Sequence, residues 1–432
     1  MKDITSASRR QFLKSTGATA LGSTFALSAL PNITFGQQTD VLKVGIIGCG
    51  GRGAGAANQA MNADPNVVLT AMADVFPDRL NTALEALKEE HEDKIQVPKE
   101  KQFIGFDAYK ELIASDVDVV LLATPPSFRP AHLAAAVEAG KHVFCEKPVA
   151  VDAPGVRSVL ASAQKAKEKN LAMVSGLCWR YHYPKRATFD KILNGDIGEP
   201  MTVYNTYNTG ALWTRDRQPE WSDMEFKMRN WLYYSWLSGD HITEQAVHSL
   251  DMMSWAMGDV MPLRAVGTGG RQRRVEEKYG NIFDHFAIVY EYESGAKGFH
   301  FSRQQADCAN AYSCEIAGTK GNAIVDVIRR NHEINNGSKW NYDGELNNMY
   351  QTEHDELFAS IRKGEPINDG EWMANSTMIA ILGRMVAYTG QSITWEDALN
   401  SDHQLGPNID DYSMDMNWED PAIAKPGLTK IG

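Results

Sequence analysis

From residue 41 onward, short apolar runs alternate with segments of helical periodicity. The runs are rich in β-branched residues and are bounded by Gly, Pro or Asp; they span 41–47, 67–73, 117–123 and 142–145. Segments of helical periodicity lie between them, at 54–61, 79–89, 109–114 and 131–139. This alternation predicts a doubly wound parallel sheet with helices on both faces, and a further run at 171–176 is its expected last strand. The charged stretch 91–101 is expected to be a solvated excursion.

The second half of the chain has a different pattern. Runs with strand character follow one another at 263–267, 286–292, 297–303, 313–317 and 323–327, with glycines at the turns. Helical periodicity returns at 352–362 and 372–388. This order predicts an antiparallel-rich sheet accompanied by helices. The Asp-, Asn- and Pro-rich residues 401–432 are expected to form an extended C-terminal arm.

The first 36 residues resemble an export signal. Ser8-Arg9-Arg10-Gln11-Phe12-Leu13-Lys14 precedes a stretch without charge, whose apolar part at 17–30 is diluted by Gly, Ser and Thr. That part is too short and too weakly apolar to span a bilayer. We predict a twin-arginine signal peptide over 1–36, a type that exports folded proteins to the periplasm or beyond. The alternative is a chance Arg-Arg pair in a disordered tail.

Charge and cysteine content narrow the function classes. The formal net charge of −12 argues against nucleic acid or an anionic membrane as a partner. The five cysteines include no Cys-x-x-Cys pair and no zinc-ribbon spacing. We expect mostly free, packed thiols and no metal.

A glycine-rich turn follows the first predicted strand. In Gly48-Cys49-Gly50-Gly51-Arg52-Gly53, the first glycine suits a tight turn, Gly50 lets a pyrophosphate approach the backbone, and Gly53 lets helix and strand pack closely. Asp74 ends the next strand, where a carboxylate binds the adenosine ribose hydroxyls. A carboxylate there repels a 2′-phosphate, so NAD is favoured over NADP, although Arg52 and Arg79 are available for a phosphate. The alternative for Asp74 is a helix cap before Pro77.

A second group of motifs resembles a known family. Thr124-Pro125-Pro126 and His132 precede the segment 139–148, which contains Glu146-Lys147-Pro148 after a strand. These motifs resemble the glucose–fructose oxidoreductase, inositol dehydrogenase and rhizopine-catabolism (Gfo/Idh/MocA) family. The resemblance implies a Rossmann domain followed by a C-terminal α/β domain, whose open mixed sheet often serves as an oligomer interface. It also implies that the quoted residues contact the cofactor and that Lys147 lies beside the nicotinamide.

Lys147 has a chemical rationale of its own. It follows a parallel strand, and ligands bind at the carboxyl ends of such strands. Pro148 fixes the turn, and an ammonium there stabilises negative charge that develops as hydride leaves a hydroxyl-bearing carbon. The alternative is a surface lysine paired with Glu146.

The segment 239–251 supplies the other catalytic candidates. His248 matches the family's histidine, and Glu244 stands where the family usually has Asp. Asp251 matches the family's following acid and is expected to bind the substrate. Glu244 and His248 are four apart and would share a helix face, with His248 as general base for a sugar hydroxyl. The alternative is a helix histidine satisfied in the core. His241, Glu244 and His248 span two helical turns, too far for one ion to bind all three.

Two further segments are expected to face the substrate. The first contains Trp179, Arg180 and Tyr181, where family members carry an arginine; an interdomain salt bridge is the alternative for Arg180. The second, 204–236, is rich in aromatic residues and is expected to be a carbohydrate-facing loop or a packed domain interface.

The predicted organisation is a signal peptide at 1–36, an NAD-binding domain at 40–178, a substrate and oligomerisation domain at 179–400, and the arm. The leading hypothesis is an exported NAD(P)-dependent oxidoreductase that acts on a secondary hydroxyl or keto group of a sugar or glycoside with a tightly bound cofactor. The alternatives are an NAD-dependent glycoside hydrolase or lyase that oxidises C3 transiently, and a non-catalytic sugar or nucleotide sensor. A homo-oligomer, dimer or tetramer, is expected.

Overall fold

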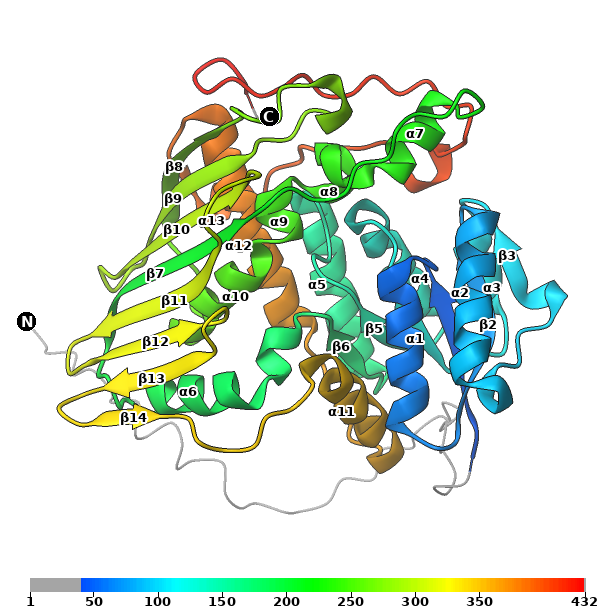
Figure 1. Cartoon of the computed structure of the whole chain (residues 1–432), viewed down its shortest axis with the longest axis horizontal. Coiled ribbons are helices and arrows are strands. Elements are labelled where there is room, and N and C mark those ends of the chain that lie inside the picture. The colour runs from blue at the N-terminus through cyan, green and yellow to red at the C-terminus, as the bar shows by residue number, and fades with distance from the viewer. Residues whose placement is uncertain (1–39, 431–432) are drawn as a thin grey trace, which may run out of the picture. The chain divides into compact units, whose positions relative to one another are not determined.

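The computed structural model describes residues 40–430, so the predicted signal peptide lies outside the described residues (Figure 1). Six parallel strands form the first sheet, in the order β3-β2-β1-β4-β5-β6. This is the strand order of a dinucleotide-binding fold, and it confirms the predicted doubly wound sheet. The strands are β1 (Leu42–Ile47), β2 (Val67–Asp74), β3 (Gln102–Ile104), β4 (Val119–Leu122), β5 (His142–Cys145) and β6 (Met173–Ser175).

Helices connect these strands close to where periodicity placed them. They are α1 (Gly51–Ala63), α2 (Pro77–Glu90), α3 (Ala108–Ala114), α4 (Arg129–Glu138) and α5 (Ala153–Glu168). The one strand of this sheet that the sequence analysis missed is β3, which follows the charged excursion. It has three residues and lies at the sheet edge, so it carries too short a pattern to be recognised.

The second sheet has nine strands in the order β14-β13-β12-β11-β7-β10-β9-β8-β15. Only the β7–β10 pair is parallel; every other neighbouring pair is antiparallel. The predicted mixed, mostly antiparallel sheet is therefore confirmed. Its strands are β7 (Pro200–Thr209), β8 (Arg264–Gly270), β9 (His285–Glu291), β10 (Lys297–Gln304), β11 (Ala311–Gly318), β12 (Asn322–Asp326), β13 (Asn331–Asn335), β14 (Lys339–Asn341) and β15 (Ile393–Thr394).

The central strand β7 contradicts the expectation that 204–236 begins as a loop. Its sequence is mostly polar, but its polar side chains have buried partners. Asn205 is fully buried; its Nδ2 donates to the carbonyl of Ser249 at 2.6 Å, and its Oδ1 lies 2.5 Å from His300 Nδ1. Since those partners come from distant segments, the local sequence gave no sign of a buried strand.

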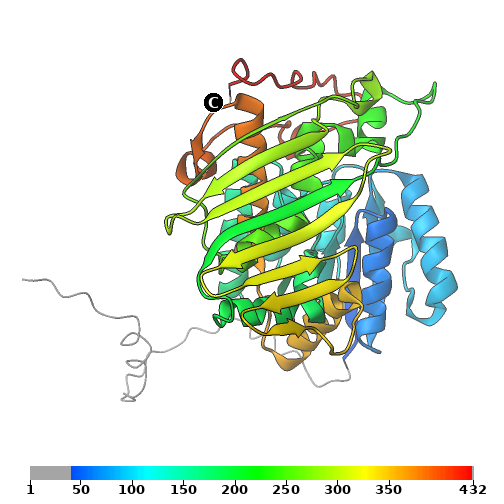
Figure 2. The ribbon, with the colours of Figure 1, turned by 60° about the vertical axis from the view of Figure 1, so that its left-hand side comes forward.

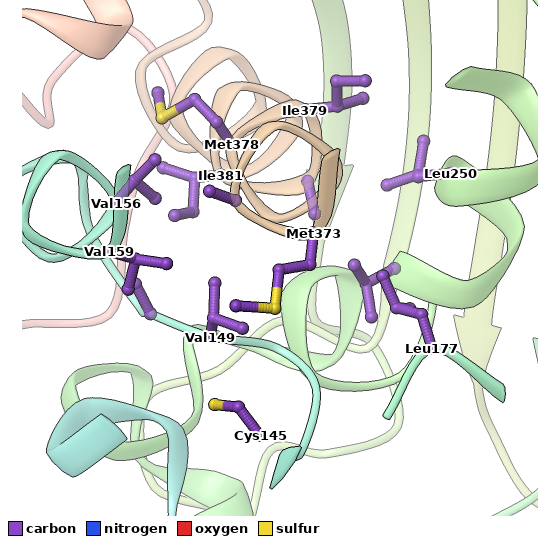
Figure 3. Close-up of a cluster of buried hydrophobic side chains, with 14 of the residues drawn as sticks. Cys145, Val149, Val156, Val159, Leu177, Leu250, Met373, Met378, Ile379 and Ile381 are labelled. Atoms are coloured by element: carbon purple, nitrogen blue, oxygen red, sulfur yellow. The ribbon is translucent and has the colours of Figure 1, made fainter. Parts of the chain in front are cut away.

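The long helix α12 (Gly370–Thr389) joins the two sheets into one core. It packs against α5, α10 (Val247–Ala256), β8 and β9. Figure 3 shows side chains of α5, α10 and α12 meeting near Cys145 of β5. The remaining helices are α6 (Tyr183–Leu193), α7 (Asp223–Arg229), α8 (Ser235–Ser238), α9 (His241–Glu244), α10 (Val247–Ala256), α11 (Met349–Lys363), α12 (Gly370–Thr389) and α13 (Trp395–Leu399).

The helices cover only one face of the large sheet. In Figure 2 its strands lie in front with no described helix over them. Residues 401–430 contain one short 3₁₀ helix (Ile409–Asp411) and otherwise run irregularly beside α7 and α8 (Figure 1). Within 40–430, no helix is both long enough and apolar enough to cross a membrane.

Candidate active site

The turn between β1 and α1 forms an open cradle. A Cβ on Gly53 would lie 1.9 Å from the carbonyl oxygen of Gly48, and Gly48 itself has a φ of 95°, so both positions require glycine. A Cβ on Gly50 or Gly51 would meet nothing within 4 Å. Helix α1 begins at this open space, where its free N–H groups attract an anion. The turn therefore fits the pyrophosphate of a dinucleotide.

A cavity of about 420 Å³ extends from this cradle along the carboxyl ends of the strands. Nine of the residues predicted to bind the cofactor line it: Gly48, Gly50, Gly51, Arg52, Gly53, Asp74, Thr124, Pro125 and His132. The predicted contacts Pro126, Glu146 and Lys147 are not among its lining residues. Pro126 is buried at the start of a short 3₁₀ helix, so the structure does not support its predicted contact.

Asp74 is held by the backbone on both oxygens. Its Oδ2 accepts from the amide of Cys49 at 2.6 Å, and its Oδ1 accepts from the amide of Phe76 at 2.9 Å. Phe76 is the N-cap residue of α2, so the alternative interpretation of Asp74 as a helix-end partner describes part of its role. The carboxylate also lines the cavity, as a ribose-binding group would.

Arg52 links the cradle to the catalytic candidates. Its Nε donates to Glu146, its Nη2 to Glu353 at 2.7 Å and its Nη1 to Gln59 at 2.7 Å. Three protein acceptors therefore engage the guanidinium, which makes Arg52 a support of the cradle more than a free phosphate ligand. Glu146 in turn accepts from the amide of Lys147 at 3.1 Å. These hydrogen bonds link the cavity beside the cradle to Lys147 through Arg52 and Glu146.

Lys147 and Glu244 meet at the carboxyl end of β5. The Lys147 Nζ donates to the carbonyl oxygen of Glu244 and to its Oε1, which lies 3.1 Å away. The alternative of a surface pair with Glu146 is wrong, because the lysine side chain is 15% exposed and its ionic partner is Glu244. The Lys147–Pro148 peptide bond is cis. Arg129, which no sequence signal indicated, is buried and donates to the Pro148 carbonyl at 2.5 Å.

His248 lies buried beside this pair. Its Nδ1 and the second oxygen of Glu244, Oε2, are both buried without a hydrogen-bond partner in the described part of the chain. Burial, reinforced by the charges of Lys147 and Lys185, lowers the pKa of His248 well below its ordinary value. The imidazole is therefore neutral at neutral pH, which is the form a general base needs.

The helix expected to carry Glu244 and His248 is interrupted. Helix α9 ends at Glu244 and α10 begins at Val247. The amide of Ala246 bonds to the carbonyl of His241, five residues back, so the two residues do not share one regular helix face as the i, i+4 spacing predicted. Within residues 40–430, no group of three or more His, Cys, Asp or Glu side chains is arranged to hold a metal ion.

Arg180 and Asp251 form a buried ion pair. The guanidinium Nη2 lies 2.8 Å from Asp251 and 2.6 Å from Asp259, and Asp251 also accepts from the Ser376 hydroxyl at 2.8 Å. Trp255 and Trp372 pack against the guanidinium. Since Asp251 is 0% exposed, this geometry favours the alternative of a structural salt bridge over the predicted substrate contacts.

Trp179 and Tyr181 have different surroundings. Trp179 packs against His248 at 5.0 Å between ring centroids, so it lies next to a catalytic candidate. Tyr181 is buried, and its hydroxyl donates to Asp369, away from that group. The prediction that Tyr181 contacts substrate is therefore not supported by its geometry.

Lys185 is a site residue that the sequence analysis missed. It is 2% exposed, its Nζ lies 5.2 Å from the Trp179 ring and 3.3 Å from His182 Nδ1, and no carboxylate in the described chain forms an ion pair with it. Burial lowers its pKa to about 8. A lysine in the first turn of a helix carries no sequence signal of such a position.

The aromatic segment reaches the nucleotide cavity. Trp213 and Trp231 line that cavity together with Arg215, Met228 and Arg229. Trp213 and Trp231 therefore face the cavity of the cradle, and their facing a carbohydrate stays a prediction.

Comparison with known proteins agrees with this geometry. Residues 42–174 match the oxidoreductase family with an NAD-binding Rossmann fold, and residues 187–324 match the GFO/IDH/MocA C-terminal domain. Together these two profiles cover more than half of the chain. The chain belongs to the Gfo/Idh/MocA family of oxidoreductases.

Individual members of the Gfo/Idh/MocA family are distant relatives. The myo-inositol 2-dehydrogenase of Thermotoga maritima is 26% identical over 339 residues, which cover 75% of this chain and 90% of the relative. The inositol 2-dehydrogenase 3 of Saccharopolyspora erythraea is 25% identical over 282 residues, which cover 65% and 72%.

Solved structures share the fold. The aldose-aldose oxidoreductase of Caulobacter crescentus, complexed with glycerol, superposes with a TM-score of 0.64 at 19% identity and covers 82% of this chain and 99% of its own. A levoglucosan dehydrogenase in complex with NADH and levoglucosan has a TM-score of 0.64 at 20% identity, with the same coverage.

Proposed function

We propose that this protein is an exported NAD-dependent oxidoreductase that oxidises a secondary hydroxyl, or reduces the matching ketone, of a sugar, polyol or glycoside. The observation that carries the proposal is the meeting of Lys147, Glu244 and His248 at the carboxyl end of β5, one residue from the Glu146 that binds Arg52 of the cradle. The inositol dehydrogenases among its relatives support a polyhydroxylated ring as substrate.

The cradle and the cavity residues would hold the dinucleotide. Gly50 and the start of α1 would hold its pyrophosphate, and Asp74 its adenosine ribose. When bound, the nicotinamide supplies hydride acceptance from, or donation to, the substrate carbon. Asp74 favours NAD, because its negative charge opposes a 2′-phosphate.

The protein side chains would manage the proton and the developing charge. Neutral His248 takes the hydroxyl proton as the carbon is oxidised. The Lys147 ammonium hydrogen-bonds the same oxygen and stabilises its negative charge. The free Oε2 of Glu244 accepts a hydrogen bond from a neighbouring hydroxyl and so orients the ring.

Export and retention of the nucleotide belong to the same proposal. The Ser8–Lys14 motif supports transport in the folded state, so a nucleotide bound before transport would travel with the protein. Outside the cytoplasm the nucleotide has to stay bound, and a second substrate has to reoxidise it. The uncovered face of the large sheet supports a homo-oligomer, because an open sheet face of this kind is a ready surface for a second copy.

The test combines ligand analysis with product analysis. Protein purified from the exported fraction should release NAD on acid treatment and convert a sugar or glycoside to a keto-sugar. Lys147→Met and His248→Ala should each lower kcat by about 10²-fold or more while NAD stays bound. The control variant Lys191→Met, at a half-buried lysine of α6 that pairs with Asp196, should match wild type. Unchanged turnover in Lys147→Met would remove the lysine from the mechanism. Release of free aglycone without net redox change would support the hydrolase or lyase reaction instead.

A further inference from the structure

One wall of the nucleotide cavity comes from outside the parallel sheet. Trp213, Arg215, Met228, Arg229 and Trp231 face the carboxyl ends of β2 and β3, where Asp74 and Phe76 lie. We propose that residues 210–236, supported by residues 405–420, form a cap that binds the adenosine half of the nucleotide and slows its release. The inference rests on the proposed nucleotide binding and adds binding residues that the Gly-rich turn does not supply.

The cap is tied to the Rossmann sheet by Arg229. Its guanidinium donates to both oxygens of Asp78, at 3.0 and 3.1 Å, and lies 4.0 Å from the ring centroid of Phe76. Asp78 belongs to the first turn of α2, directly after the strand that ends in Asp74. Arg229 therefore fixes the cap at the adenosine end of the cavity.

A separate hydrophobic cluster holds the cap in place. It joins Phe76 and Phe128 of the Rossmann half to residues of 224–237 and to Leu405 and Tyr412 of the C-terminal segment. Phe128 and Tyr412 pack with ring centroids 4.7 Å apart. Since three distant stretches of chain bury these side chains together, the cap is a packed element and not a loose loop.

The C-terminal segment also hydrogen-bonds the cap along its length. The Ser222 hydroxyl donates to the carbonyl of Met414 at 2.7 Å, and Lys227 Nζ to that of Trp418 at 2.7 Å. The indole of Trp236 donates to Asp420 at 2.9 Å. Figure 1 shows the C-terminal segment, in red, passing α7 and α8.

The groups that the cap presents suit a nucleoside phosphate. Trp213 and Trp231 offer aromatic faces for a purine, and Trp213 is 43% exposed although it lines the cavity. Arg215 and Arg79 both line the cavity, and among residues 40–430 neither forms an ion pair within 4 Å, although the carboxylate of Asp78 is close enough to interact with both charges. The two aromatic rings match the adenine of a bound NAD, and the two cations provide a positive field for its negatively charged pyrophosphate.

The test measures nucleotide binding and release and does not depend on any substrate. Trp213→Ala should raise the Kd for added NAD, and the rate at which bound NAD is lost in a chase, by about 10-fold, the effect expected from one lost ring stack. Asp78→Asn should also speed release, although Asp78 does not line the cavity, because it frees Arg229. The matched control is Tyr204→Ala, which removes a similarly exposed aromatic ring on β7 outside the cavity, and it should behave as wild type.

The inference is overturned if Trp213→Ala and Trp231→Ala both keep the wild-type Kd and release rate with an unchanged melting temperature. If wild type is purified without nucleotide yet Trp213→Ala still raises the Kd, the cap stands and the proposed retention during export fails. If the protein does not react with a sugar but the Kd values for NAD shift as expected, the proposal of a cap is supported and the proposed sugar reaction is contradicted.

Discussion

The fold brings the side chains of Lys147, Glu244 and His248 together from two distant segments of the chain. Glu244 Oε2 and His248 Nδ1 are buried polar atoms without a described partner. Leaving such an atom unsatisfied costs about 1–3 kcal/mol, so their position beside Lys147 is consistent with a ligand that completes their hydrogen bonds.

The pKa of His248 should depend on Lys185. Lys185 is cationic below about pH 8, and its charge disfavours protonation of the imidazole. Lys185→Met removes that charge, so the pKa of His248 should rise. The acid limb of the kcat/KM profile, which reports protonation of this base, should then move to higher pH. The pH profile and an NMR titration of the imidazole measure the shift. Lys191→Met is the control, and a limb that stays in place would contradict the proposed coupling.

Substitutions in the pair Arg180–Asp251 should lower the stability of the protein more than they lower its affinity for substrate. Asp251→Asn leaves a buried guanidinium with one lost partner, which should reduce the free energy of unfolding by about 3–5 kcal/mol. Asp259→Asn, at the more exposed side of the network, should cost about 1 kcal/mol. Urea unfolding measures both. Unchanged stability in Asp251→Asn together with a raised KM would restore the substrate-binding role.

At the scale of elements, two glycines in the turn from β1 to α1 have different roles. One is required for packing, and the other is required for ligand binding. Gly53→Ala places a Cβ on the Gly48 carbonyl and should cost about 3 kcal/mol of stability. Gly50→Ala meets no protein atom and should leave the melting temperature within about 1 °C while it weakens NAD binding. Thermal melts and NAD titration of the two variants distinguish these effects. Equal NAD affinity in Gly50→Ala and wild type would place the pyrophosphate elsewhere.

Elements with strong local patterns were predicted from the sequence. The alternating strands and helices of the parallel sheet and the helices α11 and α12 follow from apolar periodicity, because their buried faces are apolar. Strand β7 was not predicted, because its buried Asn205 has hydrogen-bond partners more than 40 positions away in the sequence. The break between α9 and α10 was missed because 241–251 keeps an ordinary helical sequence through Gln245.

The candidate site was predicted as far as it depends on local motifs. Glu146-Lys147-Pro148 and the Gly-rich turn identified the lysine and the cradle, and the family pattern identified His248. Lys185 and Arg129 were not indicated, and Trp213 was indicated only as part of an aromatic segment expected to face a carbohydrate, because their positions depend on the fold that brings distant segments together.

At the scale of the whole molecule, the five cysteines should all be free. Cys308 is exposed, and the other four are buried without a disulfide; burial raises the pKa of Cys145 to about 12. A thiol reagent should therefore label one cysteine quickly in the native protein and five in denaturant. Mass spectrometry of the labelled protein identifies the sites. Fewer than five labelled thiols in unreduced, denatured protein would reveal a disulfide.

Residues 405–420 are synthesised after the strands of both sheets, yet they pack on 210–236. A nascent chain that ends before residue 405 lacks Tyr412 and Asp420, so Phe128 does not yet have its ring contact with Tyr412 and Trp236 does not yet have its hydrogen bond to Asp420. The proposed cap over the adenosine end of the cavity would therefore be completed only after residues 405–420 have been made. A coenzyme could enter before then and become enclosed only afterwards.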